Sequence, residues 1–105
     1  MAHGGGNWKA LYQAAKTGDK EEVLYWLSCG TDPDAQHVEM GQTPLIAAAE
    51  NGHLEAVRAL VEGGADLSVR SHWEKHTALD AARERGQAAV VTWLESHPGK
   101  TEGLT

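Results

Sequence analysis

The sequence predicts an all-α repeat fold, an α-solenoid of three stacked helix-turn-helix units. The main observation is that the chain matches itself at a constant offset of 34 residues. The recurring positions hold Gly18, Gly52 and Gly86; Leu11, Leu45 and Leu79; Ala14, Ala48 and Ala82; and Val23, Val57 and Val91. A period of about 20 to 50 residues is the signature of repeat architectures, in which each unit buries its apolar face against its neighbours. The second observation is the helical spacing of apolar residues on both sides of the central glycine in the middle unit.

The first helix of the middle unit is predicted to begin after Thr43. Threonine is a good N-cap, and Pro44 suits the first helical position because its missing N–H costs nothing there. The apolar residues then follow an i, i+3, i+4 spacing at Leu45, Ala48 and Ala49. Gly52 can adopt the left-handed conformation that ends the helix.

A second helix is predicted from about Leu54 to the glycine pair at 63 and 64. One face of it carries Val57, Leu60 and Val61. With a tight turn at Gly52, the two helices form an antiparallel pair.

The middle unit resembles an ankyrin repeat in Thr43-Pro44-Leu45, the alanine run at 47–49, Asn51-Gly52-His53-Leu54-Glu55 and Gly64-Ala65-Asp66. Weaker copies on both sides extend the resemblance over residues 8–97. It implies three stacked ankyrin units joined by β-hairpin or loop fingers, here residues 31–42 and 65–76. Two departures stand out: Ile46 occupies the usual His position of the TPLH motif, and the spacing of 34 instead of about 33 adds one residue to each loop. In the second finger, Lys75 takes the place of Gly41 in the first, a change that could alter the turn type.

The outer units differ from the middle one at positions expected to be buried. In the first unit, Asn7 is the predicted cap of a helix from Trp8 to about Lys16, and a second helix runs from about Lys20 to Ser28. Polar residues replace apolar ones at Gln13, Lys20 and Glu22 in the first unit and at Asp80, Arg83 and Glu95 in the third, which begins at the Thr77 cap. Such residues are expected on the solvent face of end repeats. We therefore expect a complete three-repeat domain rather than a fragment.

The predicted organisation is a flexible N-terminal tail at 1–7, an ankyrin repeat domain at 8–97 and a flexible C-terminal tail at 98–105. The repeats are placed at about 8–40, 41–74 and 75–97.

The composition excludes several classes of function. Fifteen acidic residues against nine Lys and Arg give a net charge of −6, which repels phosphate and argues against nonspecific nucleic-acid binding. The single cysteine, Cys29, excludes an internal disulfide and fits a reducing compartment; it is expected to be a partly buried structural thiol. No apolar run is long enough to span a membrane. We expect an intracellular protein, cytoplasmic or nuclear, that is a monomer and binds neither nucleic acid nor membrane.

No constellation for catalysis or cofactor binding is present. His72 and His76 have a spacing that suits zinc on a helix, but they lie in a predicted loop without further ligands. The sequence contains no phosphate-binding glycine loop, nucleophile elbow or HExxH motif. We expect no enzyme activity, no cofactor and no metal site.

The ankyrin resemblance implies partner binding through the finger tips and the exposed side of each first helix. Carried over by position, this surface comprises Lys16, Thr17, Glu39, Met40, Gln42, Glu50, Asn51, Trp73, Glu74, His76, Glu84 and Arg85. Trp73 is either an exposed interface anchor or a ring folded back onto Leu67 or its own finger. The same two alternatives apply to Met40, which would offer a flexible apolar contact. Histidines in the fingers could make binding pH-sensitive. Of the other tryptophans, Trp26 is expected in the core and Trp93 half-buried.

The leading interpretation is a non-catalytic protein-interaction module with an unidentified partner. One alternative is an inhibitor-type ankyrin protein that occludes an enzyme surface. Another is a structural or designed scaffold without a natural ligand.

Overall fold

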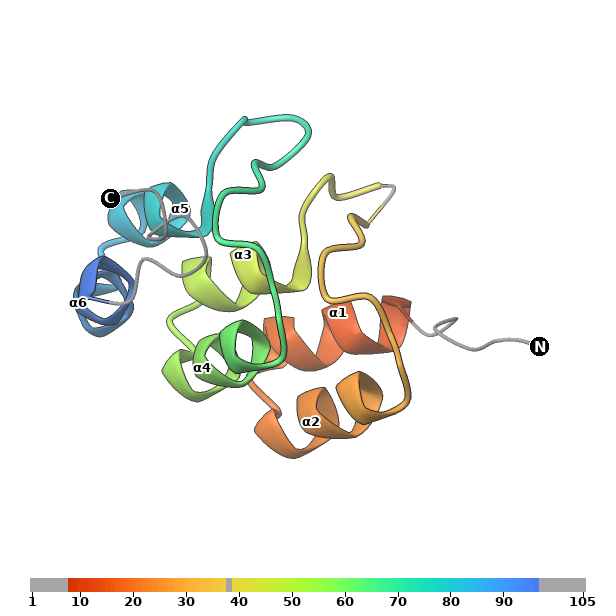
Figure 1. The fold of residues 1–105 in the computed structure, drawn as a ribbon. Coiled ribbons are helices and arrows are strands. Elements are labelled where there is room, and N and C mark those ends of the chain that lie inside the picture. Colours follow the sequence, from red (N-terminus) through yellow and green to blue (C-terminus); the bar gives the residue numbers. More distant parts are fainter. Residues whose placement is uncertain (1–7, 38, 97–105) are drawn as a thin grey trace, which may run out of the picture.

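The computed structural model describes residues 8–37 and 39–96. The helices in these ranges are α1 Trp8–Thr17, α2 Lys20–Ser28, α3 Pro44–Glu50, α4 Leu54–Glu62, α5 Ala78–Glu84 and α6 Ala88–Ser96. They form two layers, with α1, α3 and α5 in the inner layer and α2, α4 and α6 in the outer one (Figure 1). Each unit is an antiparallel pair of one inner and one outer helix. The all-α repeat fold predicted from the 34-residue period is confirmed.

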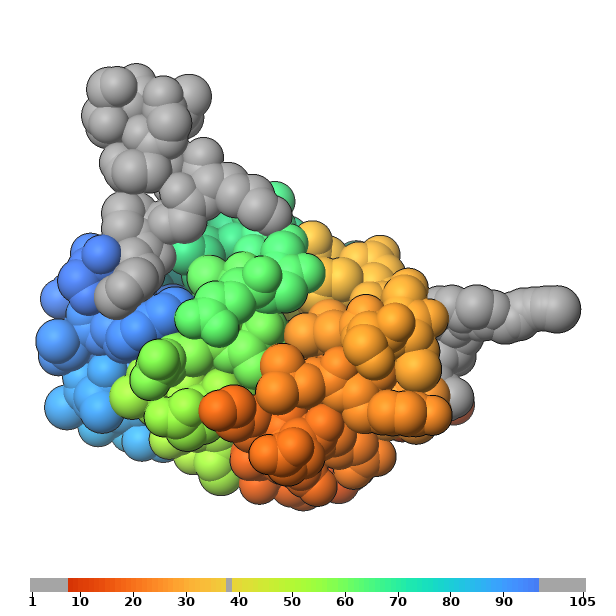
Figure 2. All heavy atoms as spheres, turned by 60° about the horizontal axis from the view of Figure 1, so that its bottom comes forward, coloured from red at the N-terminus to blue at the C-terminus, as the bar shows by residue number. Residues whose placement is uncertain are grey.

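The space-filling view shows how the outer layer is assembled. On the face turned forward in Figure 2, the sequence colours follow one another from the first unit through the second to the third. Each unit therefore contacts its sequence neighbours: α2 packs against α4, and α4 packs against α6. This is the nearest-neighbour packing expected of a solenoid.

Small side chains fill the inner layer. Ala47, Ala48 and Ala49 of α3 are fully buried, between α1 on one side and α5 on the other. The larger buried side chains are Leu11, Leu45, Ile46, Leu60, Val23, Val57 and Val90. Because alanine projects only one carbon, neighbouring helix backbones approach closely along this stripe.

The predicted helix starts are confirmed at Thr43 and Thr77. The Thr43 hydroxyl accepts a hydrogen bond from the Ile46 N–H at 3.2 Å, with proline at the first helical position. At Thr77 the bonding is reciprocal, because Asp80 also accepts from the Thr77 N–H, forming a capping box. The polar residue at 80 thus fixes the start of α5.

Replacing Thr77 with alanine is expected to lower the free energy of unfolding by about 1 kcal/mol. Hydrogen bonding from the Thr77 N–H and, to a smaller extent, from the Thr77 side chain holds the Asp80 pKa below its ordinary value of 3.8, with help from the Arg70 and His76 charges. A lowered carboxyl pKa contributes stability above the unfolded pKa, and that contribution is lost as pH falls through the folded pKa. Because Thr77→Ala removes the side-chain part of this effect, the difference in free energy of unfolding between wild type and Thr77→Ala, measured by urea denaturation, should narrow as pH falls below the ordinary carboxyl pKa of 3.8. A gap that stays constant from neutral pH into this range would contradict the capping box.

The connections between repeats contain no β-strand within residues 8–37 and 39–96. We call residues 31–42 the first finger and residues 65–76 the second finger. The predicted β-hairpin form is therefore wrong for the described residues, and the loop form is correct. In the first finger the tip is closed by backbone bonds from the His37 N–H to the Gln42 carbonyl and from the Gly41 N–H to the His37 carbonyl, at 2.8 and 2.7 Å. These bonds pair only the tip, so no ladder extends along the finger.

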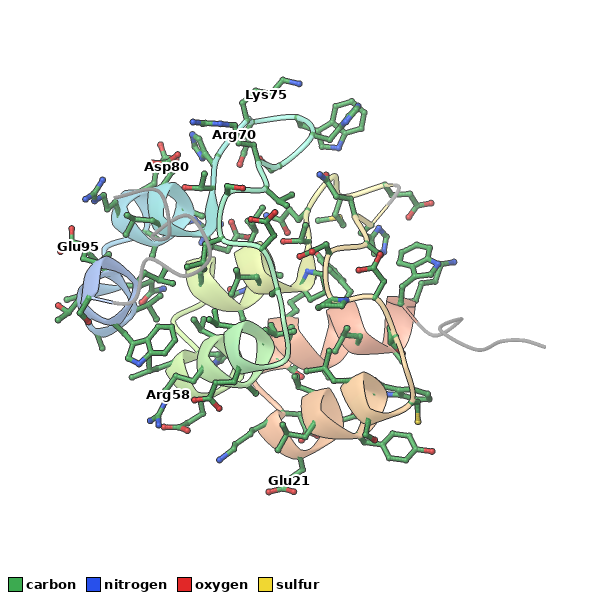
Figure 3. All side chains as sticks on the ribbon, in the orientation of Figure 1. Glu21, Arg58, Arg70, Lys75, Asp80 and Glu95 are labelled. Carbon is green, nitrogen blue, oxygen red and sulfur yellow. The ribbon has the colours of Figure 1, made fainter. Side chains whose placement is uncertain are left out.

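The second finger keeps the turn of the first although it lacks the glycine. The Ser71 and Lys75 N–H groups donate to the His76 and Ser71 carbonyls at 2.7 and 2.9 Å, the same pattern as in the first finger. Lys75 has a φ of 61°, close to the 66° of Gly41. The turn type is thus unchanged by the substitution. Figure 3 shows the Lys75 side chain at the outer end of the finger, pointing away from the helices.

Replacing Lys75 with glycine is expected to raise the free energy of unfolding by up to about 1 kcal/mol, because a left-handed conformation strains any residue with a Cβ. Lys75→Ala removes the same exposed side chain but keeps the strain, so it serves as the control. The denaturation midpoint of Lys75→Gly should be higher than that of Lys75→Ala. Equal midpoints would mean that the chain relieves the strain elsewhere.

Two burial predictions for the first unit are wrong. Cys29 is exposed, since it caps the C-terminus of α2. Trp26 is only half-buried, and its indole N–H donates to Glu22 of the same helix at 3.2 Å. Among the described helices, α2 has an outer-layer neighbour on one side only, whereas α4, which holds the equivalent Leu60, has one on each side. Trp93 is half-buried as predicted.

Several predictions concern residues outside the described ranges. They are the two flexible tails, the Asn7 cap and the last residue of the third repeat, His97.

Candidate functional site

The two fingers are hydrogen-bonded to each other at several positions along their length. The Asp34 carboxylate accepts from the Asp66 N–H at 2.8 Å near the bases of the fingers. Farther out, the Gln36 amide donates to the Arg70 carbonyl at 3.0 Å. At the tip, a backbone bond runs from the His72 N–H to the Gly41 carbonyl at 2.6 Å. The fingers therefore form one connected surface.

Trp73 completes this connection. Its indole N–H donates to the Glu39 carbonyl at 3.2 Å, and its ring lies so close to Gly41 that a Cβ there would stand 2.4 Å from Trp73 Cδ1. The side chain is still 62% exposed. The ring thus leans on the first finger, a placement that neither of the two sequence interpretations described. Its open area faces solvent.

A hollow lies where the fingers meet the C-terminal ends of the inner helices. It has a volume of about 230 Å³ and is lined by Met40, Gln42, Glu50, Ser71, Trp73, Glu74 and Arg85. All of these except Ser71 belong to the surface predicted from the sequence. We refer to this feature as the finger hollow.

Gln42 forms part of the floor of the finger hollow rather than an exposed contact. It is only 8% exposed, and its Oε1 accepts from the Tyr12 hydroxyl at 2.8 Å. Burial, together with the negative charge of Glu50, raises the Tyr12 pKa above its ordinary value of 10.0. The hydroxyl therefore keeps its proton and continues to fix Gln42.

The charged residues around the finger hollow are mostly acidic and weakly paired. Glu50 Oε2 lies 4.0 Å from Arg85 Nη2, at the limit of an ion pair. His76 Nδ1 lies 3.2 Å from Glu84 and 3.8 Å from Glu74. A surface of this charge favours contact with a basic partner.

Besides Glu84, three predicted residues lie on the inner-helix ends outside the finger hollow. Thr17 donates its hydroxyl to the Gln13 carbonyl at 3.0 Å, and Asn51 donates its amide to the Ala47 carbonyl at 2.9 Å. Both bonds stay within the residue's own helical unit. Lys16 is exposed at the end of α1.

On the other side of Trp73, the sequence indicated only the histidines, as groups that could make binding pH-sensitive. A second hollow of about 230 Å³ is lined by Gln36, His37, Gly41, His72 and Trp73. His37 is half-buried there, and its ring lies 4.7 Å from Tyr12 and 5.3 Å from Trp8 between ring centroids. Its Nδ1 accepts from the Glu39 and Met40 N–H groups at 3.2 Å each. The histidine thus shapes the first finger, and only its position in a loop could have been read from the sequence.

The described residues contain no group of three or more His, Cys, Asp or Glu side chains arranged to hold a metal ion. In the same part of the chain, every helix is too short or too polar to cross a bilayer.

Comparison with known proteins gives a consistent result. A family model of ankyrin repeats, in three copies, matches residues 11–102. The B-cell lymphoma 3 protein homolog of Mus musculus is 38% identical over 85 residues, which are 81% of this chain and 19% of that protein. SH3 and multiple ankyrin repeat domains protein 2 of Homo sapiens is 42% identical over 77 residues, 71% of this chain and 4% of that protein. The chain thus spans a fifth or less of the length of these relatives.

Proposed function

Because this chain belongs to the ankyrin repeat family, whose repeats are generally non-catalytic protein-interaction modules, we propose that it binds a partner protein through its two fingers and the inner-helix face. The contact surface is the predicted one, centred on the finger hollow. Binding takes place inside the cell, in the cytoplasm or nucleus. The protein acts there as a monomer.

The observation that carries this proposal is the joining of the two fingers at Trp73. An exposed aromatic ring on a surface fixed by hydrogen bonds loses little conformational entropy when a partner covers it. Trp73 keeps 62% of its area open while its indole N–H is bonded to the Glu39 carbonyl. Tryptophan is also among the residues that dominate interface energies, at about 2 kcal/mol or more on truncation.

The test is affinity capture of cellular proteins by wild type and by Trp73→Ala. The matched control is Tyr25→Ala, because Tyr25 is similarly exposed, at 57%, on the outer helix α2. Circular dichroism must first show that both variants keep the helical content of wild type. We expect a captured protein whose affinity falls by about tenfold or more in Trp73→Ala and is unchanged in Tyr25→Ala.

A loss of affinity in Tyr25→Ala but not in Trp73→Ala would place the binding surface on the outer layer and overturn the proposal. Equal retention by both variants would exclude the finger surface as well. The terminal faces of the stack would then be the next region to test.

A further inference from the structure

Glu50 is a partly buried carboxylate that accepts no hydrogen bond from the described residues, although its oxygens still reach solvent. Its side chain is 18% exposed, against 41% to 65% for the acidic partners in the other ion pairs of the described residues. Among the described residues it forms an ion pair with Arg85, which is 4.0 Å away and 57% exposed. Glu50 therefore offers open acceptor capacity to the finger hollow.

The walls of the finger hollow suit a cation with an apolar stem. Trp73 presents an indole 62% exposed, and Met40 presents a thioether side chain 45% exposed. Cations are attracted to the face of an indole ring within about 6 Å, and the stems of Arg and Lys pack on apolar surface. Glu74 adds a second carboxylate at the rim. The net charge of the chain, −6, adds a long-range attraction for a basic segment.

We propose that the finger hollow receives a cationic side chain, arginine or lysine, from a basic segment of the partner. This inference rests on the proposed function and names the chemistry recognised at the same site. The incoming cation donates to the Glu50 carboxylate and lies against the Trp73 indole. Arg85 can give way without the loss of a short hydrogen bond, since it approaches Glu50 only to 4.0 Å.

The probes are synthetic Gly-Ser peptides of equal length with one central residue: arginine, lysine, citrulline or glutamate. Citrulline has the shape of arginine without its charge. Binding to the full chain is followed by two-dimensional ¹⁵N–¹H NMR at millimolar peptide. We expect the arginine and lysine peptides to shift the Trp73 indole signal and the backbone signals of Glu50 and Ser71. Their affinity should exceed that of the citrulline peptide by about tenfold, the value of one charge-assisted hydrogen bond.

The decisive variant is Glu50→Gln, which keeps the size of the side chain and removes its charge. It should abolish the tenfold preference for arginine over citrulline. Glu62→Gln is the matched control, because it makes the same charge change at the exposed end of α4 in the outer layer. The preference should persist in this control.

Three outcomes would overturn the inference: equal binding of citrulline and arginine, equal loss of preference in both glutamine variants, or no shift at Trp73 with any peptide. Stronger binding of the glutamate peptide would also do so, since it would assign the hollow to an anion at Arg85. Any of these results together with Trp73-dependent capture of a cellular protein would leave the proposed function in place. Loss of Trp73 dependence alone would contradict the proposed function.

Discussion

Replacing Gly41 with alanine is expected to lower the free energy of unfolding by about 2 kcal/mol, through strain in the left-handed turn and displacement of Trp73. Gly41 has a φ of 66°, and its added Cβ would stand 2.4 Å from Trp73 Cδ1 and 2.5 Å from Nε1. No real Cβ tolerates such distances, so the indole must move. When it moves, its hydrogen bond to the Glu39 carbonyl at 3.2 Å is lost.

Gly86→Ala is a closely matched control for this prediction. Gly86 has a φ of 70°, but a Cβ there meets nothing within 4 Å. Its substitution should therefore carry only the conformational cost of about 1 kcal/mol. Urea denaturation gives both values, and the indole N–H signal of Trp73 should shift only in Gly41→Ala.

A double variant separates the two contributions at Gly41. In a Trp73→Ala background there is no ring to displace and only the His72 Cβ, at 3.1 Å, is close to the added methyl, so most of the excess cost of Gly41→Ala over Gly86→Ala should disappear. If the full cost remains, the contact between the fingers at Trp73 does not contribute to stability. The finger hollow would then lack the rigid wall on which the proposed binding depends.

The sequence was sufficient for the helices because the signals that define them are local. A threonine cap, a proline at the first turn and a left-handed glycine act within about one turn of the helix they bound. Thr43, Pro44 and Gly52 accordingly mark the limits of α3 as predicted. The repeat period then determined which helices stack.

The same reasoning was insufficient wherever burial depends on how many neighbours a unit has. Equivalent repeat positions do not share an environment, as Trp26 and Leu60 show: one is half-buried and the other fully buried. Cys29, by contrast, is exposed because it caps the C-terminus of α2. A repeat pattern gives the position of a residue within its unit, but the burial of that residue also depends on whether another unit packs against it.

The sequence predicted which residues share the surface around the finger hollow better than it predicted their geometry. Position-by-position transfer placed Trp73, Met40 and Glu50 on one surface, and the structure brings them together around the finger hollow. The bonds between the fingers could not be read from sequence, because each joins residues 31 or more apart through loop conformations that no local motif specifies. The hydrogen bond between Gln42 and Tyr12, 30 residues away, could not be read from the sequence either. It makes Gln42, which was expected to contact a partner, part of the floor of the finger hollow.

The geometry of the site depends on the close approach of the inner helices, which a substitution of Ala48 tests. Ala48 is fully buried in α3. The last residue of α3, Glu50, and the C-cap of α5, Arg85, both line the finger hollow. A leucine there adds three carbon atoms between helices with no space for them, so α3 must shift against its neighbours. We expect Ala48→Leu to lower the free energy of unfolding by about 3 kcal/mol, at the upper end for overpacked cores.

The control for Ala48→Leu is the same substitution at Ala89, which is exposed on α6. Surface substitutions of this kind change the free energy of unfolding by less than about 0.5 kcal/mol. Urea denaturation of both variants measures the difference, and the Trp73 and Arg85 NMR signals report whether the finger hollow shifts with α3. If Ala48→Leu were as stable as Ala89→Leu, the alanine stripe would not set the spacing of the inner layer. In that case the distance between Glu50 and Arg85 would have to be maintained by other contacts, such as the Gln87 amide, which donates to the Glu50 carbonyl at 2.8 Å.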